Sequence, residues 1–200
     1  MTNERETRIQ AIFENKGPVI RSIQLRKEGI GSRDIQTLLD SKKLVRLKEG
    51  YYAWHDRFEL LSDSQVALSV IPGATLYFLS AAEFHGLTTI IPNLVYVSVP
   101  NKGLVPNKPA YPPIEITQFS IALYNLGRTV EERDGFMFSV YNRERTICDF
   151  MKRWDEVGKD TVLESIRNYM AGPRDIQKLY ECAEKLRIRH LIHPYIEALV

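Results

Sequence analysis

Apolar residues at helical spacing predict three helices in the first part of the chain. We expect these helices over residues 4–15, 20–28 and 32–41, separated by turns at Gly17-Pro18 and Gly29-Ile30-Gly31. Ser32 is a good N-cap for the third helix, because its hydroxyl can accept a hydrogen bond from a free backbone N–H. Three apolar residues of that helix form the stripe that should face inward: Ile35, Leu38 and Leu39.

Two short strands are predicted directly after the third helix. They cover Leu44–Lys48 and Tyr51–His55, and Glu49-Gly50 lies between them. Gly50 can supply the positive φ that a tight hairpin turn requires. Three helices followed by a hairpin is the element order of a winged helix-turn-helix. We therefore predict such a domain over residues 1–57.

The remaining residues, 58–200, are predicted to form a second domain of mixed α/β structure, which makes the chain an α+β protein. Five of the ten prolines fall between residues 100 and 113, so this segment is expected to be a loop rather than the interior of a sheet. From Asn142 onward the apolar spacing is helical throughout. The helices and strands predicted before that point are Ser64–Ile71, Ser80–Leu87, Val95–Val99, Ile114–Thr117 and Phe136–Tyr141.

The charge of the chain is unevenly distributed. The 200 residues are 44% apolar and have a formal net charge of only +2. Residues 16–48, however, contain nine basic and three acidic side chains, a net charge of +6, which leaves −4 for the rest of the chain. A basic N-terminal module on a mildly acidic body suggests two different partners.

The cysteines and the apolar runs favour a cytoplasmic protein with no membrane partner. Cys148 and Cys182 are the two cysteines of the chain, and their wide separation is typical of reduced thiols. The charged N-terminus lacks the apolar core of a signal peptide. No run approaches the ~20 apolar residues that span a bilayer.

The predicted third helix and hairpin carry the residues expected to contact DNA. If the third helix enters the major groove, Arg33 can bind guanine and Gln36 can bind adenine, each by paired hydrogen bonds. Basic residues on and before the hairpin would meet phosphates without reading sequence. The alternatives are that these are ordinary solvated faces, or that the module docks onto another protein. The predicted DNA-binding residues are Ser32, Arg33, Gln36, Thr37, Lys42, Lys43, Arg46 and Lys48.

No catalytic constellation is evident in the sequence. It lacks GxGxxG, GxxxxGK[ST], HExxH and GxSxG, and Glu115 lacks the lysine of a carboxylate–x–lysine nuclease site. We therefore predict no enzymatic activity, no cofactor and no metal site. His190 and His193 lie three residues apart, but without an evident Cys or carboxylate partner they are interpreted as surface or helix-end residues.

Two further charged groups allow more than one interpretation. Arg145 and Asp149 lie four apart in a helix capped by Asn142, which favours an intrahelical ion pair worth about a few tenths of a kcal/mol. The alternative is a polar cluster that docks against the neighbouring strand or a partner. A C-terminal basic patch is a solvated face, an additional DNA contact or a docking surface for an acidic partner; it contains Lys185, Arg187, Arg189 and His190.

Four segments of the chain, taken in order, resemble the AbiEi antitoxin family of bacterial abortive-infection (type IV toxin–antitoxin) systems. They are RLKEGYYAW, SAAEFHGL, YVSVP and YNRERTICDF, and the resemblance covers nearly the whole chain. It implies a winged helix that represses the protein's own operon, matching residues 32–41 and 44–54. It also implies a C-terminal domain that antagonises a nucleotidyltransferase-like toxin, matching Ser80–Leu87 and Arg145–Asp149.

The chain departs from the family in the His-Gly-Leu helix, where Glu83 and Phe84 replace small or aliphatic residues. Two other functions are therefore kept beside the antitoxin. One is a transcription regulator without a toxin partner, and the other is a protein–protein interaction module. The expected partners are double-stranded DNA from the protein's own promoter and, for the antitoxin, its cognate toxin.

Overall fold

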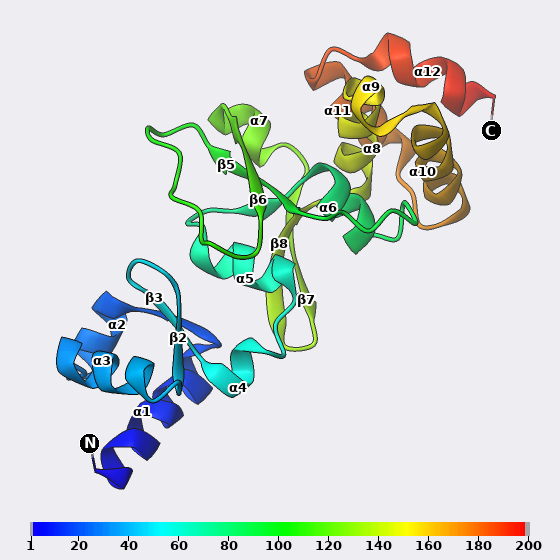
Figure 1. Cartoon of the computed structure of the whole chain (residues 1–200). Coiled ribbons are helices and arrows are strands. Elements are labelled where there is room, and N and C mark those ends of the chain that lie inside the picture. Colours follow the sequence, from blue (N-terminus) through cyan, green and yellow to red (C-terminus); the bar gives the residue numbers. More distant parts are fainter. Residues whose placement is uncertain (1, 199–200) are drawn as a thin grey trace. The chain divides into compact units, whose positions relative to one another are not determined.

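The computed structural model describes residues 2–198, which form an α+β protein of two compact units (Figure 1). Unit 1 contains the described residues up to Ile71 together with Asn107–Pro113. Unit 2 contains Pro72–Pro106 and the described residues from Ile114 onward. The chain therefore passes between the units three times. The predicted boundary between residues 57 and 58 lies inside unit 1.

Unit 1 combines helices with a three-stranded antiparallel sheet of order β1-β3-β2. The sheet joins the predicted hairpin to a strand from earlier in the chain. Gly50 has a φ of 76°, as the predicted hairpin turn requires. The elements of unit 1 are α1 (Asn3–Lys16), β1 (Val19–Arg21), α2 (Ser22–Lys27), α3 (Ser32–Asp40), β2 (Leu44–Lys48), β3 (Tyr51–Trp54), α4 (His55–Phe58) and α5 (Asp63–Val70).

The core of unit 1 lies between its helices and one face of the sheet. Phe13 of α1 packs on Trp54 of β3, with 5.9 Å between ring centroids. Ile35 and Leu38 of α3 are buried and Leu39 is half-buried, so the predicted inward stripe is confirmed. Burial of each large apolar side chain stabilises the unit by about 1.5–3 kcal/mol relative to exposure.

The prediction for residues 20–28 was wrong in its first part. Residues Val19–Arg21 form β1, and the helix begins only at Ser22. Ile20 enters the core from a strand that pairs with Tyr52, a long-range contact that local periodicity does not reveal. The cap of α3 also differs, because Gly31 is the N-cap and its N–H donates to Asp34 Oδ2 at 3.1 Å.

Unit 2 is built on a five-stranded mixed sheet of order β6-β5-β4-β8-β7. The predicted strands near residues 95, 114 and 136 are confirmed, whereas β4, β7 and α7 were not predicted. β5 and β6 run parallel, and β7 and β8 form an antiparallel hairpin. The elements are β4 (Thr75–Leu76), α6 (Phe78–Phe84), β5 (Val95–Pro100), β6 (Ile114–Phe119), α7 (Ile121–Asn125), β7 (Arg128–Arg133), β8 (Phe136–Tyr141), α8 (Arg143–Lys152), α9 (Trp154–Val157), α10 (Lys159–Ala171), α11 (Ile176–Lys185) and α12 (Arg189–Glu197).

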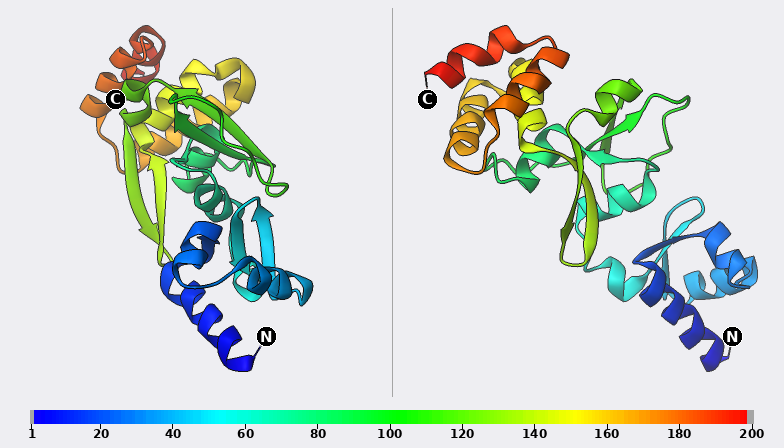
Figure 2. Two further views of the ribbon diagram at one scale, coloured as in Figure 1. Left: turned by 90° about the vertical axis from the view of Figure 1, so that its left-hand side faces the viewer. Right: turned by 180° about the vertical axis from the view of Figure 1, so that it is seen from behind.

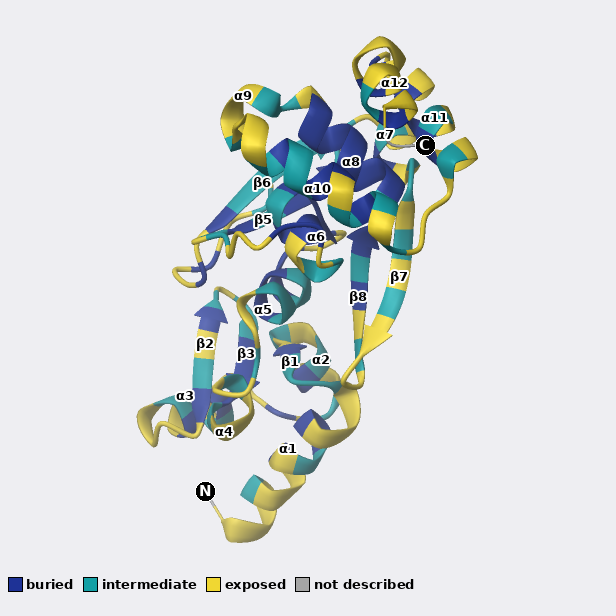
Figure 3. Cartoon of the chain, turned by 90° about the vertical axis from the view of Figure 1, so that its right-hand side faces the viewer, coloured by how far each residue is buried: buried dark blue, intermediate teal, exposed yellow. Residues whose placement is uncertain are grey.

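Helix α8 is the centre of unit 2. All residues from Glu144 to Met151 are buried, and Figure 3 shows the helix dark blue along most of its length. Phe150 of α8 meets Phe78 of α6 edge-on, with 5.2 Å between centroids. The helices that follow α8 in the sequence gather at one end of the unit in both views of Figure 2. Asn142 caps α8 as predicted, accepting from Arg145 N at 2.9 Å.

Among residues 2–198, the structure contains no helix with the length and apolar character needed to cross a membrane.

Candidate nucleic-acid interface

The outward face of α3 carries the side chains predicted to read bases. Ser32, Arg33, Gln36 and Thr37 are all exposed, because the buried Ile35 and Leu38 turn the opposite side of the helix inward. The Gln36 Nε2 donates to Asp40 Oδ1 at 2.7 Å. Within the part of the chain that the structure describes, the Arg33 guanidinium has no hydrogen-bond or ion-pair partner. It is therefore available to an external ligand.

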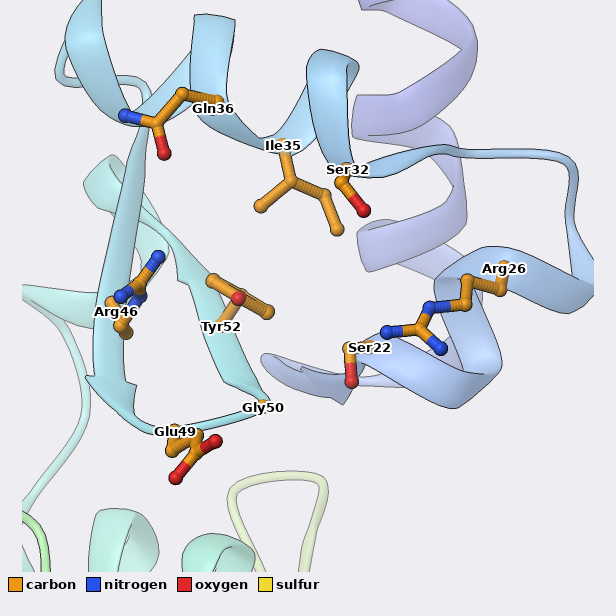
Figure 4. Close-up of a pocket in the computed structure, with 9 residues that line it drawn as sticks. All are labelled: Ser22, Arg26, Ser32, Ile35, Gln36, Arg46, Glu49, Gly50 and Tyr52. Carbon is orange, nitrogen blue, oxygen red and sulfur yellow. The ribbon is translucent and has the colours of Figure 1, made fainter.

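A groove of about 350 Å³ lies between α3, the β2–β3 hairpin and the start of α2 (Figure 4). Gln36 and Ser32 line it from α3, and Arg46 lines it from β2. The helix face and the hairpin thus meet in one concave polar surface. The complete lining is Ser22, Arg26, Ser32, Ile35, Gln36, Arg46, Glu49, Gly50 and Tyr52.

The structure separates the predicted phosphate-binding residues. Arg46 is exposed and lies over the Tyr52 ring, 5.8 Å from its centroid, on the groove side of the hairpin. Lys42 is exposed directly after α3. Lys43, by contrast, pairs with Glu6 of α1. Arg46 and Lys42 are therefore the freest of the predicted phosphate contacts.

Lys48 lies on the other face of the hairpin. The pairing of β2 with β3 is irregular between Arg46 and Lys48, so Arg46 is opposite Tyr52 whereas Lys48 is opposite Tyr51. The Lys48 ammonium lies 4.5 Å from the Tyr51 ring centroid and donates to Asn107 O at 3.0 Å. Partial burial lowers the pKa of Lys48. The structure does not bring Lys48 into the groove with Gln36 and Arg46.

Two groove residues, Ser22 and Arg26, were not predicted. Both come from α2, whose register depends on β1, and β1 was not recognised from the sequence. The signal that could have identified Arg26 is its place within the basic stretch. Glu49 also lines the groove, so the turn brings one negative charge to a mainly basic surface.

An ion pair fixes the beginning of α3 against α1. Arg5 Nε and Nη2 donate to the two oxygens of Asp34, each at 2.9 Å. The hydrogen bond from Arg5 is the main reason that the pKa of Asp34 is lowered. Because Asp34 also accepts from Gly31 N, one carboxylate orders both the entry to α3 and its contact with α1. This arrangement holds the outward face of α3 in a fixed orientation within unit 1.

Arg145 and Asp149 form the predicted intrahelical ion pair, but the pair also belongs to a buried polar cluster, which was the alternative. The pair forms within α8, with 3.0 Å between Arg145 Nε and Asp149 Oδ1, but its side chains are only 0% and 3% exposed. Arg145 Nη1 also donates to Leu123 O at 2.7 Å and to Leu126 O at 2.9 Å. Its guanidinium lies 4.5 Å from the Tyr141 ring centroid. The cluster joins α8 to the end of α7 and is therefore structural.

Burial dominates the electrostatics of this cluster. Removal from water raises the pKa of Asp149 to about 6, and Arg145 opposes the shift. Such a pair depends on its hydrogen bonds, since the cost of desolvating two charges offsets much of their attraction. Arg145 Nη2 is buried without a hydrogen-bond partner among the described residues.

The histidines of α12 lie on the surface, as predicted. His190 and His193 are exposed, and His193 Nδ1 lies 3.1 Å from Tyr180 Oη. Residues 2–198 contain no group of three or more His, Cys, Asp and Glu side chains placed to hold a metal ion. In the C-terminal basic patch, Arg189 pairs with Glu184, which reduces the net charge of that surface.

No protein-family model matches this chain, and no curated protein matches its sequence.

Proposed function

We propose that unit 1 is a winged helix-turn-helix that binds double-stranded DNA. Helix α3 would enter the major groove, and the β2–β3 hairpin would be the wing beside it. The observation that carries this proposal is the groove that Gln36 of α3 and Arg46 of β2 line together. The exposed Arg33 lies on the same helix, outside the groove lining. The excess of basic residues in this part of the chain supplies the long-range attraction to phosphates.

Each residue of this surface has a distinct role in the proposal. Arg33 presents a free guanidinium, whose fork matches the two acceptors of guanine. Gln36 would exchange its bond with Asp40 for the paired donor and acceptor of adenine. Arg46 would contact the phosphate backbone from the wing. The deciding experiment is a mobility-shift assay with the DNA upstream of the gene, titrated with salt.

Replacement of Arg33 with alanine should weaken binding to the upstream DNA by about 1–3 kcal/mol, as expected when a paired base contact is lost. Binding to a mixed-sequence duplex should change much less, because non-specific binding does not use this contact. Fluorescence anisotropy with both duplexes measures the difference. Arg57→Ala is the matched control, since Arg57 is an exposed arginine of α4 in the same unit. Equal losses for both variants would show that net charge, and not base readout, is responsible.

The biological purpose of DNA binding rests on the resemblance to AbiEi antitoxins. We propose that the protein represses its own operon by occluding the promoter, and that its C-terminal domain, residues 58–200, antagonises a nucleotidyltransferase-like toxin. The test is the neighbouring gene. A gene for such a toxin would support this role, whereas its absence would favour a regulator without a toxin partner. Failure of the intact protein to bind any duplex would favour a protein–protein module.

Toxin antagonism should survive the loss of DNA binding, because the two roles are assigned to different parts of the chain, residues 1–57 and residues 58–200. The full-length variant Arg33→Ala/Arg46→Ala is expected to restore growth when it is expressed together with the neighbouring toxin gene from an unrelated promoter. Colony counts measure the rescue of growth. Coexpression of the wild-type chain gives the upper limit of the count, and an empty vector gives the lower limit. Growth arrest with the double variant, at a protein level equal to wild type, would show that antagonism requires the DNA-binding surface.

A further inference from the structure

The basic side chains of unit 1 divide into a paired and an unpaired group. Arg5, Lys16, Lys43 and Arg57 each form an ion pair with a carboxylate, and each of these four pairs includes a residue of α1. Arg26 of α2 is exposed and has no hydrogen-bond, ion-pair or ring partner among the residues that the structure describes. Its charge is therefore free to meet an external anion.

Arg26 lies on the opposite wall of the groove from Arg46. Arg26 comes from α2, which follows β1, whereas Arg46 comes from β2. The sheet order β1-β3-β2 places these two strands on either side of β3, whose Tyr52 also lines the groove. Since neighbouring strands lie about 4.8 Å apart, the two outer strands are roughly 10 Å apart. Figure 4 shows both guanidinium groups directed into the space between the walls.

The groove opens on the side of the sheet that α3 covers. Tyr52 is paired with Ile20 and with Arg46, so these three side chains share one face, and Ile20 belongs to the core that the helices cover. Gln36 of α3 lines the same groove. Arg21 follows Ile20 in β1 and lies on the opposite face, because side chains alternate along a strand. Arg26 thus belongs to the surface that α3 presents, whereas Arg21 does not.

One carboxylate, that of Glu49, also lines the groove. Glu49 is exposed in the hairpin turn and has no ion-pair partner within residues 2–198. The groove therefore contains two unpaired arginines and one unpaired glutamate. An anion that enters it is attracted by Arg26 and Arg46 and repelled by Glu49. Substitutions of opposite charge in one groove should consequently have opposite effects on binding.

We propose that Arg26 contacts a phosphate of the DNA backbone, which passes through the groove between α2 and the hairpin. The inference rests on the proposed function, because it concerns the duplex that α3 is proposed to read. Arg46 contacts a separate phosphate from the other wall. Phosphate contacts on both sides fix the position of the backbone relative to the bases that α3 meets. Helix α2 is thereby a third element of the DNA-binding surface, beside α3 and the wing.

The first test compares the salt dependence of DNA binding for Arg26→Ala and Arg21→Ala in the full-length protein. Both variants lose one exposed arginine, from α2 and from the adjoining β1. A duplex of the DNA upstream of the gene and a mixed-sequence duplex of equal length are titrated by fluorescence anisotropy. Loss of one phosphate contact should reduce the slope of log K against log salt by about 0.9. We expect this reduction for Arg26→Ala on both duplexes, and the wild-type slope for Arg21→Ala and for Arg26→Lys, which keeps the charge.

The second test removes the repulsive charge from the groove. Glu49→Gln should tighten binding to both duplexes at 0.1 M salt, a gain that partial unfolding cannot produce. Glu59→Gln is the matched control, since Glu59 is an exposed glutamate of the same unit outside the groove lining. It should bind as the wild type does, because charges more than about 10 Å apart are largely screened at this salt concentration.

Three results would overturn the passage of the backbone through the groove. They are a wild-type slope for Arg26→Ala, equal reductions for Arg26→Ala and Arg21→Ala, and equal affinities for the two glutamine variants. Each would leave the proposed function intact if Arg33→Ala still weakened specific binding. Absence of binding by the wild-type protein would overturn both proposals.

Discussion

Replacing Arg145 with alanine is expected to lower the free energy of unfolding of unit 2 by about 3–5 kcal/mol, the range for breaking a buried ion pair. The substitution leaves the buried carboxylate of Asp149 without its cation. It also removes the donor that satisfies Leu123 O and Leu126 O. Buried acceptors without partners are destabilising in their own right, so the loss exceeds that of a surface ion pair.

The two tryptophans allow each unit to be followed separately, because Trp54 lies in unit 1 and Trp154 in unit 2. In a Trp54→Phe background, the fluorescence of Trp154 during a urea titration reports the unfolding of unit 2. Arg167→Ala is the matched control, since Arg167 is an exposed arginine on α10 of the same unit. We expect a change within about 0.5 kcal/mol for this surface variant. Similar midpoints for Arg145→Ala and Arg167→Ala would contradict a structural role for the buried cluster.

The burial of Arg145 could not be predicted from its spacing to Asp149. An arginine and an aspartate four residues apart pair on the surface of a helix as readily as in its buried face. What distinguishes this pair is the arrival of the carbonyl groups of Leu123 and Leu126, which are contributed by an earlier segment of the chain. Contacts of this kind depend on tertiary structure, and a local pattern carries no information about them.

The hairpin shows the same division between local and register-dependent features. The strands and the turn at Gly50 were predicted correctly, because alternation and turn chemistry are local properties. Simple alternation also places Arg46 and Lys48 on one face. The irregular pairing between them instead turns Lys48 away from the groove, as a bulge does when it adds a residue to one strand. The predicted site was therefore divided by a single change of register.

The unpredicted strands have a related explanation. β7 carries four charged side chains in six residues and lies at the edge of its sheet, where charge is tolerated. β4 has only two residues, Thr75 and Leu76, although it lies at the centre of the same sheet. Neither has the apolar alternation by which strands are recognised, and both depend on their neighbours for pairing.

Gly127 should be the least replaceable of the glycines in unit 2 that have positive φ, because two separate effects oppose a side chain there. Its φ of +71° is unfavourable for other residues. An added Cβ would also lie 2.6 Å from Arg145 Cβ and 2.8 Å from Asn142 Oδ1. Neither neighbour can move freely, since Asn142 caps α8 and Arg145 is held in the buried cluster.

Gly158 separates the two effects. Its φ is +82°, but no atom of the described residues lies within 4 Å of the position that an added Cβ would take. Gly158→Ala should therefore lower the stability of unit 2 by about 1–3 kcal/mol, because its φ of 82° and ψ of 152° lie in a region that is essentially restricted to glycine. Gly127→Ala should cost about 1–3 kcal/mol more, because overpacking must displace Arg145 or Asn142.

The same urea titration of Trp154 fluorescence measures both variants. A double variant that combines Gly127→Ala with Arg145→Ala refines the test, because truncation of Arg145 does not remove its Cβ. The clash at 2.6 Å thus persists in the double variant, and the penalty for Gly127→Ala should remain larger than that for Gly158→Ala. Equal losses for the two single glycine variants would show that α8 can shift away from Gly127. The close packing of Gly127 against Arg145 Cβ and Asn142 Oδ1 would then contribute nothing measurable to the stability of unit 2.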